Sequence, residues 1–204
     1  MEQSTHIPAQ STGIQKDYEA TREYETEEVA YTAYQIAASR VLNPAAYHRY
    51  HKLGTIGTFV VCGANGAPTH ALPEVGNYLR IASRAPNNPE AEAGEDWVCI
   101  EAIERDVRDR ARLLTSMTVR TCEDPRAGTG HTAHFFADSA TSTFQAALEG
   151  RTVTASIHGR NEQPNTGEEL SLLARLRNLF IALGAFSGGA LLIWQPLCEG
   201  FLEE

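Results

Sequence analysis

The stretch ATSTFQAALEGRTVTASIHG, residues 140–159, decides the fold, because apolar and polar residues alternate on both sides of a Glu149-Gly150 dipeptide. Alternation with a period of two is typical of a strand that buries one face, and a two-residue turn joins two such strands into a hairpin. With Glu149-Gly150 as the turn, we expect Leu148 to pair with Arg151. The apolar face of this hairpin then consists of Phe144, Ala146, Leu148, Val153, Ala155 and Ile157.

Five other segments are expected to form short strands, because they are rich in apolar, β-branched or aromatic residues and turn residues separate them. They are residues 57–63, 76–83, 96–106, 113–122 and 131–138. Before them, apolar residues recur at helical spacing from about Tyr18 to Leu42, and Pro44 follows. This pattern predicts an N-terminal helix that ends before the proline.

The C-terminal part of the chain predicts a pair of helices. Thr166 and Glu169 form a capping box in front of leucines that repeat at helical spacing. The run Ser187-Gly188-Gly189 then separates this helix from a second one. We therefore expect an α+β domain: a curved antiparallel sheet of about six or seven short strands, with an N-terminal helix and a C-terminal helix pair.

This order of helix, strands and long terminal helix resembles the helix-grip domains of the START and Bet v 1 class. Those domains curl an antiparallel sheet around a C-terminal helix, and they often hold an apolar ligand. The resemblance implies a fold and a small apolar ligand as a partner. Because it is architectural, it assigns no function by itself.

The composition, with 42% hydrophobic and 21% charged residues, is that of a folded protein. A length of 204 residues suits one domain, so we expect a flexible arm over residues 1–16 and a single domain over residues 17–204. The net charge of −9 argues against nucleic acid as a partner. The four cysteines have no metal-binding spacing and the first residues contain no secretory signal, so a cytoplasmic protein with free thiols and no cofactor is expected.

Four polar side chains are candidates for one catalytic site: His134, Asp138, His158 and Glu162. If residues 131–138 form a regular strand, His134 and Asp138 lie on the same side of it, and His158 at the end of the hairpin can approach them. Imidazoles and carboxylates suit general acid–base chemistry, and His134, Asp138 and His158 are candidate ligands for a divalent metal. Their spacing matches no standard motif, and the alternative is that they are polar residues at strand ends.

The polar residues after the hairpin are candidates for ligand binding. A guanidinium group can bind a carboxylate or phosphate through two parallel hydrogen bonds, which makes Arg160 a candidate together with His158 and Asn161. The same segment also serves as a connection between strand and helix, because Asn161 suits a turn and Thr166 begins the next helix. Turn chemistry leaves His158, Arg160 and Glu162 without a necessary structural role.

Residues 179–198 contain no charged side chain and have the length of a bilayer core. Gly184 and Gly188 add the spacing that lets membrane helices approach each other closely. Against a membrane anchor, the central glycines and Pro196 interrupt a continuous helix, and the segment that precedes it is amphipathic. Two buried helices explain the same residues.

Taken together, these patterns favour a soluble, non-catalytic module that binds a small apolar ligand or a protein partner. The first alternative is a small hydrolase-like enzyme that uses the His134, Asp138, His158 and Glu162 cluster, with or without a metal. The second is a membrane protein anchored through residues 179–198.

Overall fold

A computed structural model describes residues 7–51, 58–82, 95–126, 139–162 and 189–203. Its strands are β1 (Ile14–Glu23), β2 (Thr58–Cys62), β3 (Tyr78–Ala82), β4 (Glu95–Asp109), β5 (Arg112–Thr121), β6 (Thr141–Glu149) and β7 (Thr152–Glu162). Its helices are α1 (Glu27–Val41), α2 (Tyr47–Tyr50) and α4 (Gly189–Phe201), with a 3-10 turn at Pro44–Ala46.

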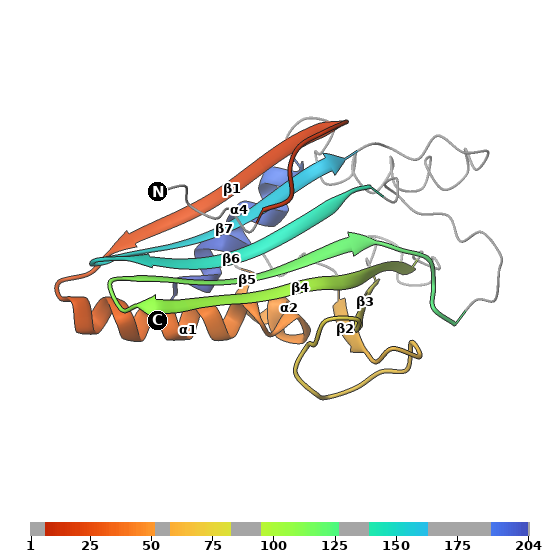
Figure 1. The fold of residues 1–204 in the computed structure, drawn as a ribbon, viewed down its shortest axis with the longest axis horizontal. Coiled ribbons are helices and arrows are strands. Elements are labelled where there is room, and N and C mark those ends of the chain that lie inside the picture. The colour runs from red at the N-terminus through yellow and green to blue at the C-terminus, as the bar shows by residue number, and fades with distance from the viewer. Residues whose placement is uncertain (1–6, 52–57, 83–94, 127–138, 163–188, 204) are drawn as a thin grey trace.

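The seven described strands form one antiparallel sheet in the order β1-β7-β6-β5-β4-β3-β2 (Figure 1). Helix α1 packs on β5, β6 and β7, while α4 packs on β1 and β7. The predicted α+β fold, with a curved antiparallel sheet and helices from both ends of the chain, is therefore confirmed. Of the predicted C-terminal pair, α4 is described, and residues 163–188 lie outside the described part, as does the expected strand 131–138.

The first strand was not expected. The helix predicted from Tyr18 is wrong in its first part, because residues up to Glu23 belong to β1, which also includes residues 14–16 of the expected arm. In this strand Tyr18 and Ala20 pack on the core, while Asp17 and Glu19 are exposed. The helix begins only at Glu27. Thr26 is its N-cap, and the Thr26 hydroxyl accepts a hydrogen bond of 3.2 Å from the Val29 amide.

The central hairpin also has a different register from the expected one. Leu148 pairs with Val153 rather than with Arg151, and Gly150-Arg151 forms the turn. Gly150 has a φ of 59°, a left-handed conformation that glycine adopts without steric cost. Because the register differs by two residues, every side chain remains on its predicted face.

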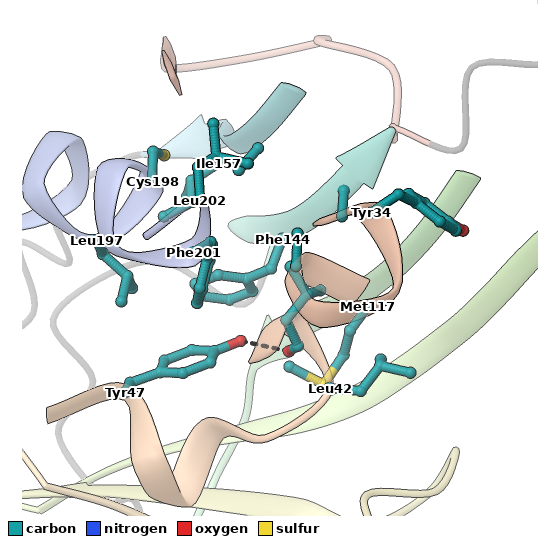
Figure 2. Packing of buried hydrophobic residues seen from close by; sticks show 14 of the residues in the cluster. Tyr34, Leu42, Tyr47, Met117, Phe144, Ile157, Leu197, Cys198, Phe201 and Leu202 are labelled. Carbon is teal, nitrogen blue, oxygen red and sulfur yellow. Dashed lines mark hydrogen bonds between the residues drawn. The ribbon is translucent and has the colours of Figure 1, made fainter. Parts of the chain in front are cut away.

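The apolar face of the sheet carries the helices and is called the inner face below. Its core is organised around Tyr47, whose ring centroid lies 5.2 Å from that of Phe201 and 5.4 Å from that of Phe144 (Figure 2). The Tyr47 hydroxyl donates a hydrogen bond of 2.6 Å to the Val41 carbonyl, so this buried polar group has a partner. Helices α1, α2 and α4 thus meet in one core on the inner face.

The terminal helix lies unusually close to α2. A Cβ atom added to Gly200 would collide with the carbonyl oxygen of Tyr50, so the absence of a side chain permits this packing. Arg40 of α1 donates hydrogen bonds to the carbonyls of Gly200 and Phe201, at 3.0 and 3.3 Å. Lysine or arginine side chains near helix C-termini satisfy carbonyls that lack an intrahelical partner.

Two further observations concern the thiols and the apolar C-terminal segment. The four cysteines are free thiols. Of the helices that the structure describes, not one combines the length and the apolar character that crossing a bilayer requires. Residues 179–188 of the segment considered as an anchor lie outside the described ranges.

A candidate ligand site on the inner face of the sheet

Strand pairing arranges the inner-face side chains in rows across the sheet. The row next to the helices is continuous and apolar: Tyr18, Ile157, Phe144, Met117 and Ile103. The next row, toward the ends of β1 and β7 that carry Ile14 and Glu162, is called the Lys16 row: Lys16, Gly159, Ser142, Val119 and Ile100. Gly159 and Ser142 have the smallest side chains of this row, while Val119 and Ile100 are buried.

The carboxylate of Glu162 lies over Gly159 in this row. Its Oε2 atom is 3.0 Å from the Lys16 ammonium group, and its side chain is 10% exposed. A Cβ atom on Gly159 would collide with its Oε1 atom, which shows that the carboxylate lies directly over the glycine. The pair therefore places one buried negative charge on a face that is otherwise mostly apolar.

A β-bulge brings Glu162 to this face. Regular alternation would place it on the outer face with His158 and Arg160. Between the pairs Ile14–Glu162 and Lys16–Gly159, however, β7 contains one residue more than β1. Asn161 absorbs the extra residue with a left-handed φ of 56°, and the side chain that follows it changes face.

Tyr18 is the third polar group at this site. It lies on β1 two residues after Lys16, on the same inner face, and its side chain is partly buried. Burial raises the pKa of its phenol, and the negative charge of Glu162 raises that pKa further. The phenol therefore remains protonated, and able to donate a hydrogen bond, over the whole physiological range.

On the outer face, His158 joins β7 to β1. Its Nδ1 atom lies 2.6 Å from Asp17 Oδ1, and its Nε2 atom lies 2.9 Å from the Ser156 hydroxyl. The Arg160 guanidinium also contacts Asp17 at 2.7 Å. Partial burial raises the pKa of Asp17, but hydrogen bonds from Gln15, His158 and Arg160 outweigh this effect and bring the pKa to about 2.

The sequence Asp17–His158–Ser156 has the order of a catalytic relay, but its surroundings are those of a structural clamp. Strand β7 is paired on both sides, so the backbone N–H groups around Ser156 donate to β1 and β6 instead of forming an oxyanion hole. Ser156 is also only 5% exposed. We therefore interpret the three side chains as a polar link between the first and last strands.

The four candidates for one catalytic site do not all meet. His158 lies on the outer face and Glu162 on the inner face, because the bulge at Asn161 separates them. His134 and Asp138 lie outside the described residues. Within the ranges that the structure describes, no three His, Cys, Asp or Glu side chains are grouped as a metal site requires.

The predicted ligand-binding residues have structural partners. The Arg160 guanidinium contacts Asp17 and donates hydrogen bonds to the carbonyls of Lys16 and Gly159, at 3.2 and 2.8 Å. The side-chain amide of Asn161 binds Ala9, Ser11 and Thr12 of the N-terminal segment. Lys16 and Tyr18 were not among the predicted site residues, although their alternation with Asp17 and Glu19 is a strand signal.

A hollow of about 460 Å³ lies near the β2 edge of the sheet. It is lined by Tyr78, Arg120, Thr121, Cys122, Glu123, Asp124 and Pro125. Of these residues, Arg120 pairs with Glu101, and Asp124 pairs with Arg126 at 2.7 Å. We place the candidate site on the inner face instead, because the Glu162 carboxylate is buried there on a mostly apolar face.

Comparisons with known proteins give similarity in structure only. No family model matches the chain, and no curated protein matches it.

Solved structures with a similar fold include a major latex-like protein from Panax ginseng. It has 13% identity and a TM-score of 0.38, and the alignment covers 84% of this chain and 96% of that one. Truncated norcoclaurine synthase from Thalictrum flavum has 12% identity and a TM-score of 0.41, with 96% of each chain covered. The Zhui aromatase/cyclase from Streptomyces sp. R1128 has 9% identity and a TM-score of 0.48, covering 93% of this chain and 92% of that one. Similarity at this level concerns the outline of the chain and carries no functional conclusion.

Proposed function

We propose that this protein is a non-catalytic binding module for a small, mostly apolar ligand with one hydrogen-bond donor. The ligand lies on the inner face over the Lys16 row, with its donor on Glu162. The observation that carries the proposal is the position of the Glu162 carboxylate, which lies over Gly159 on a mostly apolar face with 10% of its side chain exposed.

The carboxylate has capacity for a ligand. An ionised carboxylate only accepts hydrogen bonds, and its two oxygens offer about four acceptor positions. Among the described residues, Lys16 supplies the ion pair, and its side chain is 34% exposed. Burial of a charge is costly unless its hydrogen bonds are made, so a hydroxyl or amine donor is a favourable partner for Glu162.

The apolar part of the ligand has a matching surface. Tyr18 of β1 and Trp194 of α4 provide it, and the Trp194 ring packs edge-on against the buried Phe144 with 5.9 Å between centroids. Trp194 and Tyr18 are only partly buried, unlike the core around Tyr47. A small apolar molecule gains stability mainly by removing such surfaces from water.

The test is a fluorescence titration with N-phenyl-1-naphthylamine, a neutral aromatic probe with a single N–H donor. We expect the protein to bind it, and Glu162→Gln to weaken binding about tenfold, because a charge-assisted hydrogen bond is lost. Glu149→Gln is the matched control: Glu149 is exposed at the hairpin and pairs with Arg112, so the variant should bind like the parent protein.

A second probe separates hydrogen bonding from hydrophobic contact. The hydrocarbon 1-benzylnaphthalene has the same two ring systems, with a CH2 group in place of the N–H. The parent protein should prefer the amine over the hydrocarbon, and Glu162→Gln should reduce this preference. Failure of the parent protein to bind either probe, or equal binding by Glu162→Gln, would contradict the proposed site.

A further inference from the structure

The N-terminal segment is attached to the end of β7 through a single residue, Asn161. The Oδ1 atom of Asn161 accepts hydrogen bonds from the backbone amides of Ser11 and Thr12, at 2.8 and 3.1 Å. It also accepts one from the Ser11 hydroxyl at 3.1 Å. These contacts use the side-chain oxygen of Asn161 fully, and they hold a segment that lies at the other end of the sequence.

The remaining polar groups of Asn161 bind the same segment. The side-chain Nδ2 donates to the carbonyl of Ala9 at 3.1 Å, and the backbone N–H donates to Gln10 Oε1 at 2.9 Å. Asn161 is 7% exposed, so these bonds satisfy a buried amide. Donors and acceptors on both sides match along four consecutive residues.

Asn161 is also the residue that determines the face on which Glu162 lies. Its left-handed φ of 56° forms the bulge after which Glu162 lies over Gly159. A non-glycine residue adopts this conformation at an energetic cost, and asparagine tolerates it best when its short side chain is hydrogen-bonded. The hydrogen bonds to residues 9–12 provide this support.

We propose that Asn161 is a positioning residue for the ligand site, and that the bound segment 9–12 is part of that site. The segment stabilises the bulge, and the bulge holds the Glu162 carboxylate on the inner face. Docking of the segment and binding of the ligand are therefore coupled, and each strengthens the other. This inference rests on the proposed function, because it concerns the affinity of the same site.

The main test combines backbone and side-chain changes at position 161. Asn161→Gly retains the left-handed backbone and removes the four side-chain hydrogen bonds to Ala9, Ser11 and Thr12. Asn161→Asp retains the acceptor oxygen, but it replaces the donor to Ala9 with a second acceptor and adds a negative charge. Two quantities are measured: amide hydrogen exchange of Ser11 and Thr12, and affinity for N-phenyl-1-naphthylamine.

For Asn161→Gly we expect faster exchange at Ser11 and Thr12 and an affinity about fivefold lower than that of the parent protein. Asn161→Asp should show slower exchange at these amides and a smaller loss of affinity than Asn161→Gly, because it retains the acceptor of both amides. In the parent protein, a saturating concentration of the probe should slow exchange at both amides, because coupling between two binding events is reciprocal.

Two further variants serve as checks. Gln10→Ala removes the acceptor of the Asn161 N–H without changing β7. We therefore expect it to lower the affinity for the probe, and this variant keeps the test available if Asn161→Gly folds poorly. Asn65→Gly removes another asparagine side chain that accepts a local backbone hydrogen bond, from Ala67 at 3.1 Å, and should change neither quantity.

The outcomes separate this inference from the proposed function. If Asn161→Gly accelerates exchange but binds the probe like the parent protein, the segment is only a structural attachment and the inference is wrong. Unchanged exchange in Asn161→Gly also overturns it, because Asn161 then does not hold the segment. If the parent protein binds no probe, the proposed function fails first, and the coupling fails with it.

Discussion

The carboxylate of Glu162 lies where a side chain on Gly159 would have to be. The two residues belong to the same strand, and three positions separate them, so regular alternation would place them on opposite faces. The bulge at Asn161 brings them together, and the glycine makes the space that the carboxylate occupies.

Replacing Gly159 therefore tests the site directly. In Gly159→Ala, we expect the Glu162 carboxylate to be displaced and the affinity for N-phenyl-1-naphthylamine to fall about tenfold. The colliding atom is the end of a flexible side chain, so the free energy of unfolding should fall by only about 1 kcal/mol. Fluorescence titration and urea unfolding measure the two effects, and a large loss of stability without loss of binding would contradict this expectation.

Gly200→Ala should reduce the free energy of unfolding more than Gly159→Ala does. The added methyl group would meet the backbone carbonyl of Tyr50, which cannot move without shifting α2 against α4. We expect a loss of about 2–3 kcal/mol in the free energy of unfolding, as for overpacked cores. Gly63→Ala is the control, because its Cβ would meet its nearest neighbour, Asn65 Oδ1, at an ordinary 3.5 Å. Similar stability of the two variants would argue against the close helix crossing.

The link between Asp17 and its cationic neighbours predicts a pH dependence of stability. The pKa of Asp17 is about 2 in the folded protein, below the ordinary value of 3.8, so the ionised form is favoured by folding. Its contribution is fully present above about pH 4 and decreases as the pH falls toward 2. Urea unfolding should show that Asp17→Asn destabilises the protein near neutral pH, and that the difference from the parent protein shrinks between pH 4 and 2. A difference that does not change with pH would exclude a role for the charge.

Thiol reactivity should report the burial of α4 against β1. Burial raises the pKa of Cys198 to about 12, and its thiol lies 3.6 Å from the Tyr18 carbonyl. The thiolate is the reactive form, so Cys198 should react with a disulfide reagent only after unfolding. Mass spectrometry of partly labelled protein can identify the site, and rapid labelling of native Cys198 would show that the helix detaches from the strand.

The sequence predicts the sheet better than it predicts its first strand. The alternation of Phe144, Ala146 and Leu148 places these side chains on the core face whatever the exact turn, because a register change of two residues preserves the faces. The first strand was missed because its glutamates continue into the start of α1, and a charged run with apolar residues at spacings of three and four also fits a helix. Only the Thr26 cap marks the boundary.

The candidate site could be predicted only in part. Turn chemistry and charge make Glu162, Arg160 and Asn161 candidates, and Asn161 does adopt the left-handed backbone that suits a turn. The structure places it inside a strand instead. A bulge of one residue reverses the face of every side chain after it, and single-sequence periodicity contains no sign of it.

The pairing of β1 with β7 also has a consequence for how the protein is made. Lys16 lies early in the sequence and Glu162 lies late. Among the described strands, β1 pairs with β7, so the strand that carries Lys16 waits for this partner until most of the sequence has left the ribosome. Contacts between such distant positions form slowly, because a long loop must close before they contribute. The site is thus expected to be among the last parts of the molecule to form, and a chain truncated before β7 would have the beginning of a binding site without the carboxylate that completes it.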